Sequence, residues 1–315
     1  MQSNESKCIK NVYNIVLHSS KAPVVCRKQE IRIKPKIPIP LQTRPHIETR
    51  RDPQLPVLMH DVDERIMQLC LACVYILDRK SNVFLVVEVR KSLIPVQLKL
   101  IRRLRKAGAK SDATRGCGVH IHIGLGDHTP QTLRNLANIM ASHENLLASA
   151  LKLDENRMDR YCRTVDSCFL MKLNEKKPKT MEELADVWYS GNGADFRRTN
   201  HYNDSRYHML NYHATFTKGT VEFRLFQFDA PADGKQNGLH AGQLKSYIQL
   251  CLALSQMAKM VKTASPKPQQ VENPKYAMRT WLLRLGFIGE EFATARDILT
   301  RNLAGDAAFR HGRPA

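Results

Sequence analysis

Several features that define other protein classes are missing from this sequence of 315 residues. No apolar run approaches the roughly 20 residues that a membrane-spanning helix needs, and the opening residues lack the apolar core of a signal peptide. The eight cysteines follow no pairing rhythm, and the C-x-x-C at Cys70 and Cys73 has no second half that would complete a zinc site. We therefore expect a cytoplasmic protein with no membrane partner, in which these cysteines are core thiols.

Acidic residues are scarce relative to basic ones. Thirty Asp and Glu face 49 Lys and Arg, which gives a formal net charge of +19. Such a charge attracts polyanions, either nucleic acid or nucleotide phosphates. Residues 1–50 alone carry ten Lys and Arg against three Glu, but Tyr13 is the only Phe, Trp or Tyr among them and no recognition module follows. We interpret this segment as a solvated tail, and nucleic acid is not the expected partner.

Proline divides the chain into two parts. Seven of the 15 prolines lie between Pro23 and Pro56, and proline neither donates to a backbone ladder nor tolerates helix in the residue before it. Residues 1–56 are therefore predicted to be a proline-rich, basic, poorly ordered extension. Residues 57–315 are predicted to form the functional domain, with a helical C-terminal part over about 261–315.

The second part shows both helix and strand periodicity. Predicted helices cover 96–107, 130–147, a segment that begins at the capping box Thr180-x-x-Glu183 and ends at Gly191, 239–260, 276–285 and 290–303. Predicted strands cover 83–89, 118–124 and a hairpin, 207–217 with 220–228, joined across Lys218-Gly219. The apolar stretch 66–77 fits either structure. This order predicts an α+β fold with a mostly antiparallel sheet flanked by helices.

Two histidines alternate along the predicted strand Gly118–Gly124. Period two places His120 and His122 on one face and three branched apolar residues on the other. Neighbouring imidazoles on one face can bind one metal ion or one phosphate. Two surface histidines on a half-exposed strand explain the motif as well, so H-x-H alone leaves both interpretations open.

A second polar pattern occupies the predicted strand that starts at Thr220. Glu222 and Arg224 share one face, opposite apolar residues. A carboxylate suits Mg²⁺ and a planar guanidinium grips phosphate oxygens, although the two can also be a structural ion pair. Arg206 and Asn211 add polar groups on the partner strand. Together with the histidines, this pattern favours a metal–nucleotide site.

The two motifs, Cys-Gly-Val-His-Ile-His-Ile-Gly and Thr-Val-Glu-Phe-Arg-Leu-Phe, in this order and with Arg-Tyr and Asn between them, resemble the amidoligase family. The resemblance runs from about Val83 to about Met260. It implies a fold like the catalytic domain of glutamine synthetase. It also implies ATP-dependent joining of a carboxylate to an amine, which are small molecules or peptides, through an acyl phosphate.

The resemblance also implies roles for individual residues. His120 and Glu222 would bind Mg²⁺ or Mn²⁺, joined by Glu88 from a partly matching segment. His122 and Arg224 would contact ATP phosphates, and Arg224 would act in catalysis. Arg206 and Asn211 match polar positions of the family and complete the predicted catalytic set.

Family members usually begin with a Gly-x-Glu-x-Glu strand, and this sequence offers only Glu48 in a proline-rich context. Because hard cations prefer several oxygen ligands, two expectations stand: an active ligase, or one weakened or inactivated by its atypical N-terminus. Two alternatives from other classes also remain. A metal-dependent hydrolase would use His120, His122 and Glu222 around Zn²⁺, and a non-catalytic nucleic-acid-binding protein would depend on the basic charge alone.

Overall fold

The computed structural model describes residues 72–78, 83–89, 94–106, 109, 111–112, 117–229, 238–268 and 271–311, with 72–78, 83–89 and 94–97 as backbone only. The predicted extension 1–56, Glu48 and Cys70 lie outside these residues, and so does the predicted boundary near residue 57. The described part mixes helices with one antiparallel sheet, as the sequence predicts for an α+β fold.

Five strands form the sheet in the order β2-β1-β3-β5-β4. They are β1 (Ala72–Asp78), β2 (Val83–Val89), β3 (Gly118–Gly124), β4 (Leu210–Asn211) and β5 (Thr220–Phe226). All neighbouring strands pair antiparallel. The ambiguous stretch 66–77 therefore contributes a strand, and β3 has the bounds that its alternation predicts.

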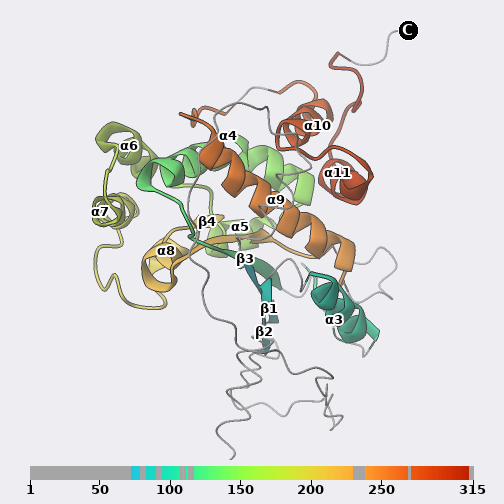
Figure 1. Ribbon diagram of the computed structural model, residues 1–315, viewed down its shortest axis with the longest axis horizontal. Helices are drawn as coiled ribbons and strands as arrows, with labels where there is room; N and C mark the ends of the chain where they lie inside the picture. The colour runs from blue at the N-terminus through green and yellow to red at the C-terminus, as the bar shows by residue number, and fades with distance from the viewer. Residues whose placement is uncertain are drawn as a thin grey trace, which may run out of the picture.

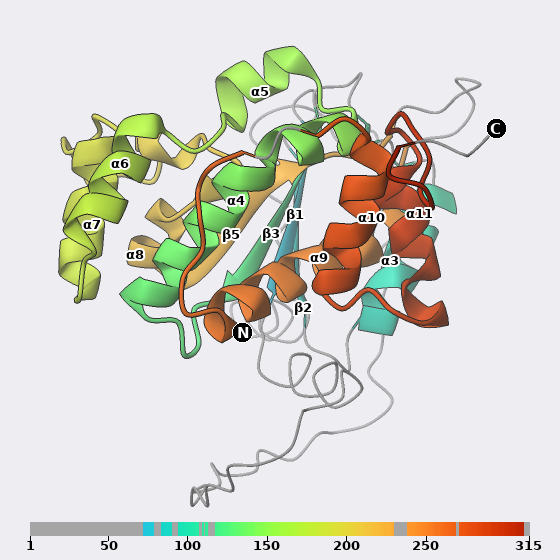
Figure 2. The same cartoon turned by 90° about the horizontal axis from the view of Figure 1, so that it is seen from above.

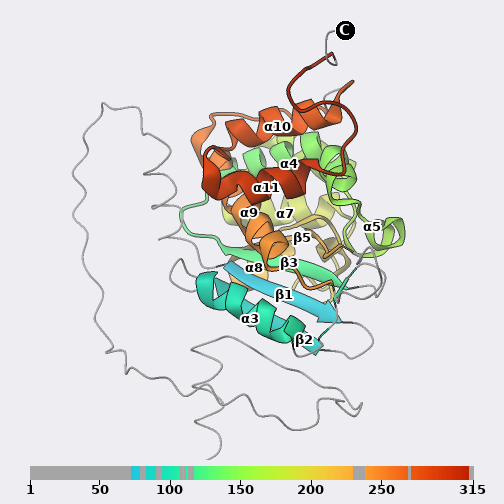
Figure 3. The ribbon, with the colours of Figure 1, turned by 90° about the vertical axis from the view of Figure 1, so that its right-hand side faces the viewer.

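The helices form two layers on the apolar side of the sheet. The inner layer consists of α4 (Pro130–Leu151) and α9 (Ala241–Met260), and α9 contacts β3. Over these two helices lie α10 (Pro274–Arg284) and α11 (Ala293–Thr300), which the 3-10 turn η4 (Glu290–Phe292) precedes (Figure 3). The basic helix α3 (Ile94–Lys106) packs against α9 and lies apart from α6 and α7 (Figure 1).

A third group of helices lies at the other end of the sheet, away from α10 and α11 (Figure 2). It comprises α6 (Ser167–Lys176), α7 (Met181–Gly191) and α8 (His213–Lys218), and α6 packs closely on α7. Between this group and the inner layer the chain forms α5 (Glu155–Tyr161), and the short 3-10 turn η3 (Asp204–Arg206) precedes β4. The fold therefore flanks the β3–β5 pair with helices from both halves of the chain.

Helix starts follow their sequence signals. Thr129 caps α4, with Pro130 in the first turn, and Thr180 with Glu183 forms the predicted capping box of α7. The core combines the apolar face of the sheet with α4 and α9, and it includes the fully buried Ile121, Phe223 and Leu136. Burial of such side chains contributes about 1.5–3 kcal/mol each, so this face fixes the register of the sheet.

The predicted hairpin is wrong over most of its first arm. Only Leu210 and Asn211 form a strand, paired with Phe223 and Glu222, and residues 213–218 form the helix α8. The Asn211 side chain accepts the His213 backbone N–H at 2.8 Å, which turns the chain out of the sheet. Gly219, in the left-handed region at φ 67°, then caps α8 instead of forming a two-residue hairpin turn.

Within the described residues, no helix combines the length and the apolar character needed to cross a bilayer.

Candidate functional site

One row of residues runs across all five strands on the polar face of the sheet. Glu88 pairs with Cys73, Cys73 with His122, His122 with Glu222, and Glu222 with Asn211. Directly opposite residues share a face of a sheet, so strand pairing brings together three chain segments that are far apart in sequence: 73–88, 122 and 211–222. The two motifs singled out in the sequence therefore meet side by side.

The carboxylate of Glu222 is the hub of this row. Its Oε1 accepts a hydrogen bond from Arg224 Nη1 at 2.7 Å, and its Oε2 accepts one from Asn211 Nδ2 at 2.6 Å. His120 Nδ1 and His122 Nε2 lie 3.3 and 3.4 Å from the same Oε1. We call these five residues the polar cluster. The structure thus joins five of the predicted site residues around one carboxylate.

The two histidines of the polar cluster differ in access. His122 is 2% exposed, and its Nδ1 lies 2.9 Å from the Thr220 hydroxyl, so both ring nitrogens face polar groups. The side chain of His120 is 12% exposed, and among the described residues only its Nδ1 has a polar partner. A ligand would therefore meet the cluster at the His120 ring, while His122 is buried beside Glu222.

Charge in the polar cluster is fixed by the Glu222–Arg224 pair. Burial alone would raise the pKa of Glu222, but the Arg224 charge, reinforced by His122 and His120, outweighs it and holds that pKa well below its usual value. Burial, followed by the Arg224 charge, lowers the pKa of His120 to about 3. At neutral pH the cluster therefore contains an ionised carboxylate beside a neutral imidazole.

A bulge in β5 sets the position of Arg224. Val119 pairs with Phe226, but Ile121 pairs with Phe223, so β5 carries one more residue than β3 over this interval. Arg157 of α5 donates to the carbonyls of Arg224 and Leu225 at 2.5 and 2.9 Å. A buried guanidinium thus satisfies the backbone groups that the bulge frees from the ladder. Sequence reasoning missed Arg157, because nothing in α5 marks it.

Arg206 and Glu88 are the predicted site residues outside the polar cluster. Arg206 ends the turn η3, and its guanidinium and that of Arg224 both lie 5.7 Å from the centre of the Tyr207 ring. Arg206 is therefore a neighbour of the cluster. Glu88 occupies a register position in the same row, but its side chain lies outside the described ones, so its role as a ligand stays a prediction.

Metal binding needs free ligand atoms, and the polar cluster offers few. Among the side chains that the structure describes, no group of three or more His, Cys, Asp and Glu is arranged to hold a metal ion. Both oxygens of Glu222 already accept N–H groups, and Mg²⁺ prefers several oxygens to imidazole nitrogens. The described residues alone therefore do not fit a resident Mg²⁺.

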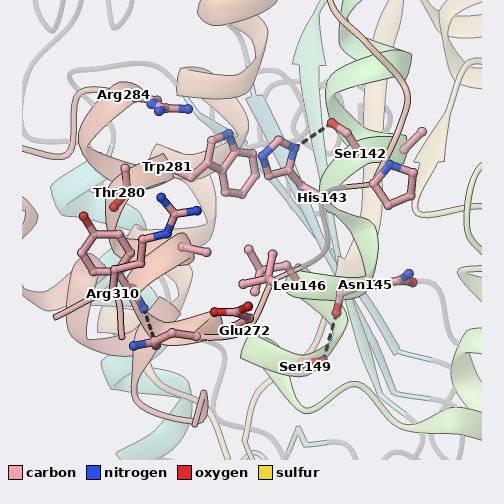
Figure 4. Close-up of a pocket in the computed structure, with 16 residues that line it drawn as sticks. Ser142, His143, Asn145, Leu146, Ser149, Glu272, Thr280, Trp281, Arg284 and Arg310 are labelled. Carbon is pink, nitrogen blue, oxygen red and sulfur yellow. Dashed lines mark hydrogen bonds between the residues drawn. The ribbon is translucent and has the colours of Figure 1, made fainter. Parts of the chain in front are cut away.

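A cavity of about 730 Å³ lies elsewhere, between α4, α10 and the chain near Arg310 (Figure 4). His143 stacks on Trp281 there, with ring centroids 3.9 Å apart, and donates or accepts at the Ser142 hydroxyl. None of the residues that line this cavity belongs to the polar cluster. The charged residues that line it are exposed: Glu272, Arg284 and Arg310. The cavity is therefore a different place from the buried polar cluster that the two sequence motifs form.

The structure has an α+β fold, and its sheet carries a buried cluster formed by the His-x-His and Glu-x-Arg motifs. A family model described as "Putative amidoligase enzyme" matches residues 86–255, which is more than half of the chain. The chain therefore belongs to this amidoligase family, and the match agrees with the extent of the resemblance seen in the sequence. Comparison with curated proteins and with solved structures gave no match.

Proposed function

We propose that this protein is a cytoplasmic ATP-dependent carboxylate–amine ligase that works through an acyl phosphate, on a sheet like that of glutamine synthetase. The observation that supports it most is the convergence of His120, His122 and Arg224 on the single carboxylate of Glu222. These residues come from the two motifs that carry the resemblance, and the family match spans both.

The chemistry needs positive charge where phosphoryl oxygens gather. In the first half-reaction a substrate carboxylate oxygen attacks the γ-phosphorus of Mg-ATP, and ADP leaves. Arg224 supplies a fixed guanidinium at the cluster, and His120 Nε2 supplies an accessible nitrogen beside it. Preorganised donors aimed at developing charge are the main contribution that a protein makes to such a transfer.

The second half-reaction forms the amide. The amine nitrogen attacks the carbonyl carbon of the acyl phosphate, the carbon–oxygen bond breaks, and inorganic phosphate leaves with the electron pair while the amine loses a proton. Glu222 keeps Arg224 in place during both steps, because its two oxygens hold Arg224 and Asn211 at once. In this proposal, Glu222 is a positioning residue for the guanidinium and not a Mg²⁺ ligand, because both of its oxygens are already taken.

Calorimetric titration with ATP, with and without Mg²⁺, tests the proposal. We expect saturable, Mg²⁺-dependent binding to the wild-type protein and a loss of at least about tenfold in affinity in Glu222→Gln. Glu144→Gln is the matched control, since Glu144 is also a buried carboxylate (4% exposed) but lies on α4 outside the polar cluster. Circular dichroism at the titration temperature establishes that each variant is folded.

Four results would count against the ligase. ATP that binds equally well with and without Mg²⁺ would contradict it, as would equal affinity in Glu222→Gln and Glu144→Gln. Retention of Zn²⁺ through purification together with no ATP binding would favour the metal-dependent hydrolase. If the folded wild-type protein binds no nucleotide, the protein has kept the fold without the activity.

A further inference from the structure

The solvent-facing side of helix α3 carries only positive charge. The exposed residues among its described side chains are Lys99, Arg102, Arg103 and Lys106. Their spacing of i, i+3, i+4 and i+7 places all four along one face of the helix. The helix contains no acidic residue. We call these four residues the basic stripe.

The opposite side of α3 is committed to the core. Ile101 is 1% exposed and belongs to the hydrophobic core, and Leu98 and Leu104 pack against it. The helix packs on α9 and lies at the margin of the described fold (Figure 3). Packing therefore holds the basic stripe toward solvent. It also leaves α3 without an apolar face that could enter a membrane.

The fold does not neutralise the basic stripe. None of its four members forms an ion pair with another described residue. Like charges four residues apart, such as Lys99 with Arg103, destabilise a helix. The helix dipole favours cations in the last turn, which includes Arg103 and Lys106, but Lys99 and Arg102 precede that turn. A repulsive arrangement that local structure does not require indicates a counter-ion from outside.

The dimensions of the basic stripe match those of a nucleic-acid duplex. Seven residues separate its ends, which is about 10 Å of helix axis. A duplex carries one phosphate charge per about 1.7 Å of its axis, or about six phosphates over that length. Arginine and lysine are the side chains that bind phosphate oxygens. The stripe has no aromatic ring to stack on an unpaired base and no amide to read a base edge, so it suits a duplex backbone.

We propose that the basic stripe of α3 binds the phosphate backbone of double-stranded nucleic acid without reading its sequence. This function is separate from the proposed ligase, because the stripe shares no residue with the polar cluster. Residues 1–50, from which nucleic acid was not the expected partner, do not include the stripe. An acidic polypeptide and an anionic membrane are the competing ligands.

Fluorescence anisotropy with a labelled DNA duplex of about 20 base pairs tests the proposal on the full-length protein. The titrations run without ATP, between about 50 and 200 mM salt. If each member of the stripe contacts one phosphate, the stripe contributes about −3.6 to the slope of log K against log salt. The variant with all four residues changed to Gln should have a slope shallower by about 3 to 4. A duplex of different sequence should bind the wild-type protein within about threefold.

The matched control removes the same charge from exposed lysines that form no stripe. It changes four residues to Gln: Lys176, Lys179, Lys262 and Lys267. Because both variants lose four charges, a difference between them reports the place of the charges and not their sum. The control slope should change by less than about one. If the stripe variant is unfolded by circular dichroism, the single variant Arg103→Gln replaces it, with a slope shallower by about one.

The outcomes separate the stripe from the overall charge and from the ligase. Equal slopes in the wild-type protein and the stripe variant would overturn the proposal, and so would equal losses in the stripe variant and the control. Polyglutamate, or vesicles that contain phosphatidylserine, would displace the duplex as the assigned ligand if the stripe bound them more tightly. Stripe-dependent duplex binding in a protein that binds no Mg-ATP would support the proposal while contradicting the ligase.

Discussion

Removing both partners of the Glu222–Arg224 pair should lower the free energy of unfolding by clearly less than the sum of the two single removals. The side chains are 3% and 4% exposed, and Arg224 Nη1 lies 2.7 Å from Glu222 Oε1. Removing one member of a buried pair costs about 3–5 kcal/mol, because the other charge is left uncompensated in a medium that solvates it poorly. Removing both leaves no such charge.

The remaining contacts predict which single change is worse. In Glu222→Gln, Arg224 loses its counter-charge and keeps only neutral acceptors: the new amide oxygen, the Tyr161 carbonyl 3.4 Å from its Nε, and His120. In Arg224→Met, Glu222 keeps the amide of Asn211 at 2.6 Å and both histidines. We therefore expect Glu222→Gln near the upper end of the range and Arg224→Met near its lower end.

Urea unfolding followed by circular dichroism measures the effect for both single variants and for the double variant. The double variant should be destabilised by at least about 1 kcal/mol less than the sum of the single ones, since contacting charges couple by about 0.5–3 kcal/mol. Additivity within about 0.5 kcal/mol would refute the reasoning, because it would mean that neither single variant strands a buried charge.

Four further predictions concern other parts of the molecule. A carboxyl with a lowered pKa stabilises the folded state at pH values above its pKa in the unfolded chain, and this stability is lost as the pH falls. Arg224→Met lets the pKa of Glu222 rise, so it should shift acid unfolding to higher pH. An unshifted acid unfolding transition would contradict this. Burial raises the pKa of Glu144 to about 7, so wild-type stability should fall by about 3 kcal/mol as the pH rises from about 4.5 to 7 and then level off, and Glu144→Gln should flatten that fall in urea titrations at pH 5 and 8; equal slopes would refute it. Gly191→Ala would place a Cβ 2.4 Å from Phe169 Cα and should cost about 1–3 kcal/mol by thermal unfolding as α6 and α7 separate; an unchanged melting temperature would contradict the packing. Thr180→Ala removes one half of the α7 capping box and should cost about 1 kcal/mol by urea unfolding, whereas Thr180→Ser should cost little; equal losses would exclude the hydroxyl as the cause.

Sequence periodicity was sufficient for the parts of the fold that local rules control. The alternation in Gly118–Gly124 gave β3, and the capping residues Thr129 and Thr180 gave the starts of α4 and α7. Period two also placed His120 with His122, and Glu222 with Arg224, on shared faces. That the two pairs meet depends on strand order, which period two cannot give and which the pairing of β3 with β5 establishes.

The same rules failed at two other places. Residues 213–218 have the β-branched and aromatic composition of a strand, but an asparagine side chain bonds to the backbone there and a helix forms instead. Arg157 was not predicted as a site residue, since its role depends on two carbonyls of β5. No local signal encodes such contacts.

The bulge in β5 has a consequence for comparing related sequences. Glu222 and Phe223 of β5 pair with His122 and Ile121 of β3. Phe226, however, pairs with Val119, so beyond Phe223 the two strands are offset by one residue. An alignment that pairs the two motifs rigidly, without an offset, will therefore assign residues beyond Arg224 to the wrong side of the sheet. Relatives that lack a long basic side chain at the position of Arg157 should also lack the extra residue, and the two positions should change together.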